Sequence, residues 1–225
     1  ERSEKLRLLT DGSFNCAAKS LNNVANVASV AWDTSALEAW RIHEGARIGF
    51  GAIGKGYALD QVRVLLEQQG LHDFVLSAGG SSIILSGFAA PGEPWNWGWS
   101  WKKSEAGNAL GMALTHPSGQ AIAIGVSGTH EKGRHLIDPR GQLYEMSAPQ
   151  STLVALASAA DADALSTALF VSGYDQGARY LSRLPADAAM AQIDSATFPS
   201  WNGIFQKLWG SLAIQAAPVL IIASL

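Results

Sequence analysis

The sequence predicts an α+β fold: a single compact domain in which mixed or antiparallel sheets carry flanking helices. Three observations support this prediction. Helical and extended patterns alternate irregularly along the chain, without the strict repetition of a doubly wound sheet. No internal repeat or low-complexity linker divides the 225 residues. The hydrophobic content of 48% is ample for one large core.

The clearest helical pattern covers residues 57–69, which are followed by Gly70 as a stop signal. Apolar residues recur there at helical spacing, so an amphipathic helix with one buried face is expected. The side chains on that face are Leu59, Val62, Leu65 and Leu66.

Two further helices and several strands are predicted along the chain. Residues 161–170 are rich in alanine and leucine and are followed by Gly173, and residues 174–184 continue a helical pattern. A pair of glycines, Gly79 and Gly80, marks a bend between two of the expected strands. The predicted strands cover residues 74–77, 82–85, 121–125, 153–157 and 190–193.

One predicted strand, residues 94–102, carries indoles at alternate positions, which would place them on one face of the sheet. They belong to Trp95, Trp97, Trp99 and Trp101. The simpler interpretation is a bulky apolar layer over the core. The alternative is a stacking platform for an aromatic ligand or a docking face for a protein.

Charge and cysteine content exclude several functions. The formal net charge is -3 and no basic run is present, so no nucleic-acid partner is expected. Cys16 is the only cysteine, which excludes an internal disulfide and a cysteine metal cluster.

The first residues lack the apolar core of a signal peptide. Residues 208–225 form an interrupted apolar run that fits a buried terminal strand better than a membrane span, although membrane association stays possible.

The glycine-rich residues 49–54 match a dinucleotide-binding fingerprint as text, and with Lys55 they come close to a phosphate-binding loop. Both matches fail on mechanism. The strand after the helix ends in glycines where a ribose-binding acid belongs, and Gly56 stands where the loop needs a hydroxyl for magnesium. Small residues, one lysine and a following helix still favour a phosphate-bearing ligand, about as strongly as they favour a simple turn.

Asp163 and Thr167 are four residues apart on a predicted helix, which places a carboxylate and a hydroxyl on the same face. Both are hard oxygen ligands that suit magnesium, although for the pair taken alone a helix-dipole and packing role is the stronger interpretation. His135 precedes Asp138 and Pro139 and is a candidate general base, but a structural role is the more common one for an isolated histidine.

Several motifs occur in the order found in the FAD:protein FMN transferases, the ApbE family, and the chain resembles that family over residues 10–195. They are Lys-Gly-Tyr-Ala-Leu-Asp at 55–60, Gly-Gly at 79–80, Pro-Trp at 94–95, Ser-Gly at 127–128, His-Leu-Ile-Asp-Pro at 135–139 and Ala-Asp-Ala-Leu-Ser-Thr at 162–167. An Asp-Gly-Ser-Phe-Asn element at 11–15 also resembles the family.

The resemblance implies roles for particular residues. Magnesium would be bound by Asp163, Thr167 and the backbone carbonyl of Ala52. His135 would be the general base, with His130 as the alternative. FAD would be contacted by Ser13, Phe14, Asn15, Lys55 and Ile137.

The same resemblance implies a magnesium-dependent enzyme that transfers FMN from FAD to a threonine of an acceptor flavoprotein and releases AMP. The alternatives are a catalytically degenerate FAD-binding protein and an FAD pyrophosphatase. Gly49 stands where the family usually has an FAD-contacting aspartate. We expect a transferase domain at residues 1–195 without the family's N-terminal stretch, then an apolar extension at 196–225. The family also implies a bacterial periplasmic or cell-envelope location.

Overall fold

A computed structural model describes residues 1–18, 30–33, 35–42, 44–103, 109–116, 119–128, 139, 151–184, 189–193 and 199–201. Within these ranges the helices are α1 (Arg2–Leu9), α2 (Gly54–Gln68), α3 (Ala159–Ser172) and α4 (Tyr174–Leu181). The strands are β1 (Val30–Asp33), β2 (Glu38–Arg41), β3 (Phe74–Ala78), β4 (Ser82–Ser86), β5 (Phe88–Ala90), β6 (Glu93–Lys103), β7 (Ala109–His116), β8 (Ile122–Gly128), β9 (Ser151–Leu156), β10 (Ala189–Ile193) and β11 (Pro199–Trp201).

The centre of the fold is a six-stranded sheet in the order β11-β10-β9-β8-β4-β3. Its neighbouring strands all pair antiparallel. β3 and β4 form a hairpin whose turn holds Gly79 and Gly80 at φ 62° and 69°, a backbone conformation that favours glycine. β1 with β2, and β5 with β6 and β7, form two smaller sheets. The predicted α+β class is confirmed, as one compact domain.

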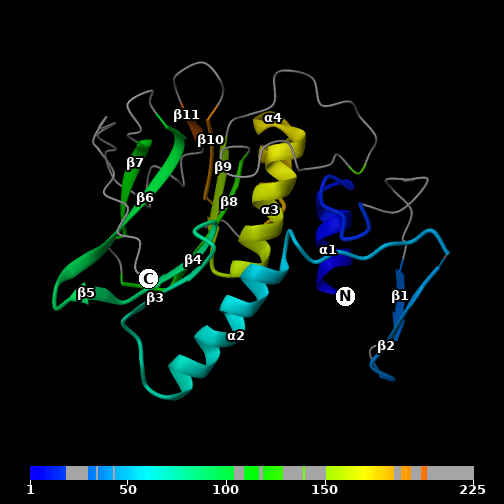
Figure 1. The fold of residues 1–225 in the computed structure, drawn as a ribbon, viewed down its shortest axis with the longest axis horizontal. Coiled ribbons are helices and arrows are strands. Elements are labelled where there is room, and N and C mark those ends of the chain that lie inside the picture. Colours follow the sequence, from blue (N-terminus) through cyan, green and yellow to red (C-terminus); the bar gives the residue numbers. More distant parts are fainter. Residues whose placement is uncertain are drawn as a thin grey trace.

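Helix α3 lies against one face of the central sheet, on β8 and β9, and α1 lies on the other side of α3 (Figure 1). Every residue of β4 is buried, and so are ten of the 14 residues of α3. Helix α3 is therefore the centre of the core, and its polar residues Asp163 and Ser166 are buried with it. Gly125 permits this close packing, because a Cβ there would lie 2.1 Å from the backbone oxygen of Ala162.

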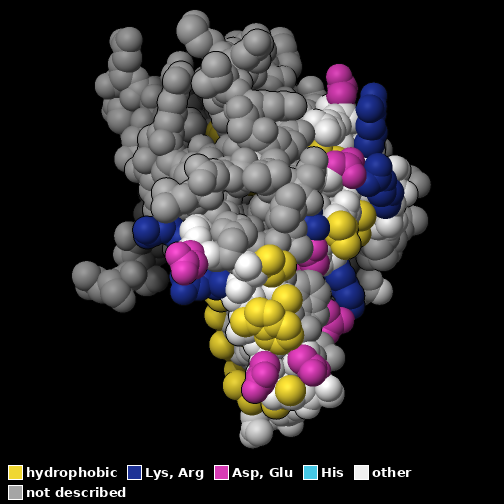
Figure 2. Space-filling view, turned by 90° about the vertical axis from the view of Figure 1, so that its right-hand side faces the viewer, with side chains coloured by type: hydrophobic (Ala, Val, Ile, Leu, Met, Phe, Trp, Pro, Cys, Tyr) yellow, Lys and Arg dark blue, Asp and Glu magenta, His cyan; other side chains and the backbone are white. Residues whose placement is uncertain are grey.

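Helix α2 meets the N-terminal end of α3 and projects away from it (Figure 1). The expected buried face of this helix is only partly correct. Leu59 is 7% exposed, but Val62 and Leu65 are 40% and 61% exposed. Figure 2 shows hydrophobic side chains at the surface in the lower part of the molecule, at the height of α2 in Figure 1. Only the first two turns of α2 are packed into the core, so the rest of its apolar face stays at the surface.

The indole pattern on β6 also departs from expectation. β6 is one strand, but its register against β7 shifts between Ser100 and Lys102, so strict alternation does not extend through Trp101. Trp99 is 1% exposed and its Nε1 donates to Ser151 Oγ at 3.0 Å, while Trp95 Nε1 donates to the backbone oxygen of Ser86 at 2.7 Å. Packing over the core accounts for Trp99.

The strand β11 lies beyond the expected domain boundary at residue 195 and pairs with β10 as the edge of the central sheet. The rest of the expected extension, at 196–198 and 202–225, lies outside the described residues, and the domain boundary stays a prediction. Among the helices that the structure describes, none combines the length and the apolar character needed to cross a bilayer.

Candidate active site

The glycine-rich segment before α2 is fixed at the surface of α3. Ile53, the residue before the helix, is 6% exposed and belongs to a hydrophobic cluster with residues of α1, β9 and α3. Gly56 then brings the two helix backbones together, because a Cβ at this position would lie 2.0 Å from the backbone oxygen of Ala159. Glycine is therefore required at position 56 for α2 to pack against α3.

Asp60 joins α2 to α3 through the free N–H groups at the start of α3. Its Oδ1 accepts from Ala159 N at 2.9 Å, and its Oδ2 accepts from Ala160 N at 3.0 Å and from Ser158 Oγ at 2.9 Å. A carboxylate is stabilised by the positive end of a helix dipole, and it satisfies donors that have no partner within the helix. The last residue of the 55–60 motif thus acts in structure rather than on a ligand.

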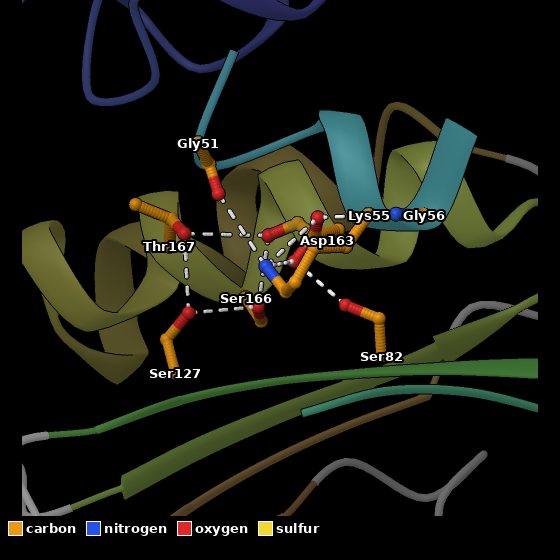
Figure 3. A network of polar contacts seen from close by, with 8 residues as sticks. All are labelled: Gly51, Lys55, Gly56, Ser82, Ser127, Asp163, Ser166 and Thr167. Carbon is orange, nitrogen blue, oxygen red and sulfur yellow. Dashed lines mark hydrogen bonds and ion pairs between the residues drawn. The ribbon is translucent and has the colours of Figure 1, made fainter. Parts of the chain in front are cut away.

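Asp163 is the charged centre of the site and is 2% exposed. Its Oδ1 accepts from Lys55 Nζ at 2.9 Å and from Ser82 Oγ at 3.0 Å. Its Oδ2 accepts from Lys55 Nζ at 3.2 Å and from Gly56 N at 3.2 Å. These donors come from α2 and β4 and converge on one carboxylate of α3 (Figure 3). A buried carboxylate is tolerated only when it is paired and hydrogen-bonded in this way.

A group of hydroxyls continues the site along α3 toward the end of β8 (Figure 3). Thr167 Oγ1 donates to the backbone oxygen of Asp163 at 3.3 Å and lies 3.1 Å from Ser127 Oγ. Ser127 Oγ lies 2.9 Å from Ser166 Oγ, which donates to the same Asp163 carbonyl at 2.9 Å. The expected helical spacing of Asp163 and Thr167 is confirmed, and their oxygens lie on the same stretch of α3.

The Lys55 ammonium marks a position for positive charge. Besides Asp163, Lys55 Nζ reaches the backbone oxygen of Gly51 at 3.4 Å, and the lysine side chain is 35% exposed. The cation therefore lies between a buried carboxylate and a carbonyl of the glycine-rich turn, at the edge of the solvent.

The donors around this position fit magnesium in kind. Asp163, Thr167 and the Gly51 carbonyl offer only oxygen atoms, which Mg²⁺ prefers, and the ion usually keeps further positions for water and substrate phosphates. In the described ranges, no group of three or more His, Cys, Asp and Glu side chains could hold a metal. A metal here would thus depend on one carboxylate supplemented by hydroxyl and carbonyl oxygens. The structure shows the Gly51 carbonyl beside Lys55, and the expected role of the Ala52 carbonyl stays a prediction.

Three expected FAD contacts from the N-terminal element have structural partners. Ser13 is 1% exposed and its Oγ lies 2.8 Å from Tyr180 Oη, and Phe14 is 2% exposed within the hydrophobic cluster around α3. Asn15 Oδ1 accepts from Ala17 N at 2.8 Å. Their contacts with FAD stay predictions.

The structure does not describe the residues that were expected to act as general base and to contact the flavin. His135, His130 and Ile137 lie outside the described residues, so their roles also remain predictions. Conversely, the structure adds residues that the sequence reasoning did not assign to the site: Gly56, Ser82, Ser127 and Ser166. The Gly-Gly motif ends two residues before Ser82, and Ser127 is the first residue of the Ser-Gly motif, so these two motifs were the available signal.

Fold and site together define an α+β domain with a buried carboxylate, hydroxyls and a bound ammonium beside a glycine-rich helix start. A model of the ApbE family matches residues 1–191, and the chain belongs to this family.

Curated relatives include the FAD:protein FMN transferases of Salmonella typhimurium and Escherichia coli K12. Each is 27% identical to this chain over 163 residues, which make up 68% of this chain and 45% of the relative. The chain thus matches less than half the length of these relatives.

Solved structures of the family share the fold. The flavin transferase ApbE from Vibrio cholerae matches with a TM-score of 0.74 and 20% identity, over 92% of this chain and 74% of that chain. The apo flavinyl transferase ApbE from Pseudomonas stutzeri matches with a TM-score of 0.73 and 20% identity, over 93% and 72%. These likenesses confirm the architecture.

Proposed function

We propose that this protein is a magnesium-dependent flavin transferase that moves FMN from FAD to a threonine hydroxyl of an acceptor flavoprotein and releases AMP. Family membership and the activity named for its relatives support a flavin-transfer reaction. The observation that carries the proposal is the buried Asp163 carboxylate, which lies against the glycine-rich turn with Lys55 and Thr167 beside it.

The proposed reaction is a phosphoryl-type transfer. The threonine Oγ bonds to the phosphorus on the FMN side of FAD, and the bond from that phosphorus to the bridging oxygen breaks. AMP leaves with the bridging oxygen, and the hydroxyl proton passes to a base, for which His135 is our candidate. When bound, Mg²⁺ would neutralise charge on the diphosphate, which is the main source of catalysis in such reactions.

The residues of the chain hold this site in place before the substrate arrives. Gly56 N and Ser82 Oγ fix the Asp163 carboxylate, so its oxygens are preorganised. Ser127 and Ser166 hold the Thr167 end of the donor set through their hydroxyl contacts. Lys55 Nζ bonds both oxygens of Asp163, and the lysine side chain lies at the solvent edge of the site.

The experiment is to incubate the protein with FAD, Mg²⁺ and a threonine-bearing acceptor flavoprotein, and to follow covalent FMN and AMP by mass spectrometry. We expect equal amounts of FMN adduct and AMP, and no adduct on an acceptor whose threonine is replaced by alanine. Free FMN and AMP without adduct would show hydrolysis instead of transfer. Bound FAD without release of AMP would indicate an FAD-binding protein and would refute the proposed transferase activity.

A matched pair of variants tests the site itself. Asp163→Ala should abolish metal-dependent turnover, because it removes the buried carboxylate. Asp161→Ala is the control: it removes another carboxylate of α3, one that pairs with Arg2 at 2.7 Å, and this variant should retain turnover. Unchanged magnesium dependence in Asp163→Ala would refute the metal assignment.

The acceptor and the location rest on the family resemblance. We propose an acceptor flavoprotein with threonine in its flavinylation motif, in the bacterial periplasm or cell envelope. Immunoblotting of fractionated cells would locate the native protein. Recovery in the cytoplasmic fraction alone would contradict this location.

A further inference from the structure

Hydrogen bonds occupy all the lone-pair positions of the Asp163 carboxylate, so none is left for an additional ligand. Two carboxylate oxygens together offer about four lone-pair positions. Four contacts use them: Lys55 Nζ touches both oxygens, Ser82 Oγ donates to Oδ1, and Gly56 N donates to Oδ2. A metal ion can bind here only if one of these donors leaves.

The three donors differ in how easily they can leave. Ser82 is 0% exposed within β4, so its hydroxyl is fixed in the core. The Gly56 N–H belongs to a backbone that is packed directly on α3 at Ala159. The Lys55 side chain is 35% exposed and has a flexible four-carbon stem, so its ammonium can move into solvent. Lys55 is the donor that can be exchanged.

We propose that Lys55 is a positioning residue that acts as an internal cation: its ammonium neutralises Asp163 until a divalent metal takes its place, and the released ammonium then binds the diphosphate of the dinucleotide. This inference rests on the proposed function for the identity of the ligands. It also adds a mechanism that the proposed function does not require, because metal and dinucleotide become coupled through one lysine.

The coupling follows from the geometry. While Lys55 is bound to Asp163 and to the Gly51 carbonyl, its charge is already compensated and is of little use to a phosphate. Metal binding at Asp163 supplies the compensating charge from another source and frees the ammonium at the solvent edge. The coupling free energy between two bound ligands is reciprocal. The dinucleotide must therefore strengthen metal binding by the same factor by which the metal strengthens dinucleotide binding.

The first test measures metal affinity without dinucleotide and without turnover. Titration of Mn²⁺ into the FAD-free protein by calorimetry compares the wild type with Lys55→Met, which keeps an unbranched side chain one atom shorter and removes its charge. We expect the variant to bind about 10- to 100-fold more tightly, the factor set by a competing charge-assisted hydrogen bond. Equal or weaker binding would overturn the proposal.

Two controls accompany this measurement. Lys5→Met removes a lysine charge that is paired with Glu1 on the surface, at 2.6 Å, and it should leave the Mn²⁺ affinity at the wild-type value. Lys55→Arg restores a cation on the same helix and should return the affinity toward that of the wild type. If Lys5→Met tightened binding as much as Lys55→Met, net charge rather than displacement would be the cause and the proposal would be wrong.

The second test needs no variant, so it stands even if Lys55→Met does not fold. Acetylation of the wild-type protein by an amine reagent, read by peptide mass spectrometry, reports the freedom of the Lys55 amine. We expect faster acetylation with Mg²⁺ than without it, and renewed protection when ADP is added as a diphosphate probe. A Lys55 rate that Mg²⁺ does not change would overturn the proposal, whatever the transfer assay shows.

Discussion

Replacement of Gly56 by alanine perturbs the packing that brings α2 to α3 and thereby forms the site. A Cβ at this position would lie 2.0 Å from the oxygen and 2.4 Å from the carbon of the Ala159 backbone carbonyl. Both atoms belong to the backbone, so no side-chain rotation relieves the contact. The two helices must separate by roughly 1.4 Å to restore an ordinary 3.4 Å contact.

The size of the effect follows from two opposing terms. Overpacking of a core costs about 1–3 kcal/mol, and the separation also weakens the Asp60 bonds to Ala159 and Ala160, a cap worth about 1 kcal/mol. Alanine in a helix gains about 1 kcal/mol over glycine. We expect a net loss of about 2 kcal/mol in the free energy of unfolding. For a chain of this size that lowers Tm by about 4–8 °C.

Urea unfolding followed by tryptophan fluorescence measures this loss, because the chain has eight tryptophans. Gly54→Ala is the matched control: it makes the same substitution two residues earlier on α2, where a Cβ meets only Phe50 Cβ at 3.6 Å. It should be neutral or slightly stabilising. If Gly56→Ala were as stable as the wild type, or Gly54→Ala equally destabilised, the close contact would not be the cause.

Three further substitutions or treatments have defined outcomes. Asp60→Ala should lower Tm by about 2–4 °C in thermal circular dichroism, because it removes a cap worth about 1 kcal/mol from the start of α3; an unchanged Tm would contradict the cap. Gly49→Asp should tighten FAD binding about 5- to 10-fold in flavin fluorescence titrations, because it adds the carboxylate that the family usually has here and no described residue lies within 4 Å of a Cβ at this position; Gly49→Ala should not, and equal affinities would refute this role. Burial raises the pKa of the Cys16 thiol, so its thiolate forms at higher pH than in the unfolded chain; iodoacetamide at pH 8 should alkylate it about 10-fold more slowly in the folded protein than in urea, and equal rates would be inconsistent with that shift.

Local patterns in the sequence predicted much of the fold, because the signals for individual elements are themselves local. A helix was expected at residues 161–170 from their alanine and leucine content, and α3 covers Ala159–Ser172, with Gly173 ending it at φ 78°. The glycine pair between β3 and β4 likewise forms the turn that was expected of it. These elements depend on residues close together in the chain.

The predictions failed where packing between distant segments decides the outcome. Val62 and Leu65 have helical spacing, but α2 approaches α3 through Gly56, and a glycine contact leaves no hydrophobic signal in the sequence. The shift in register near Trp101 depends on the pairing of β6 with β7, which one strand alone does not reveal.

The candidate site was predictable only in part for the same reason. The spacing of Asp163 and Thr167 placed both on one helix face, as the structure has them. The ion pair between Lys55 and Asp163 joins residues 108 positions apart, and nothing local to either residue indicates it. Ser82 reaches the same carboxylate from a third element, so its role emerges only once the β4 strand is placed under α3.

The proposed flavin transfer requires that Asp163 bind a divalent cation beside the diphosphate of FAD. A crystal structure of the protein with FAD and Mn²⁺, with anomalous diffraction at the manganese edge, tests it most directly. We expect an anomalous peak at about 2.1–2.2 Å from an Asp163 carboxylate oxygen, with Thr167 Oγ1 and a diphosphate oxygen in the same shell and Lys55 displaced from the carboxylate. Bound FAD with no manganese at Asp163, or with manganese elsewhere and the Lys55–Asp163 bond intact, would contradict it.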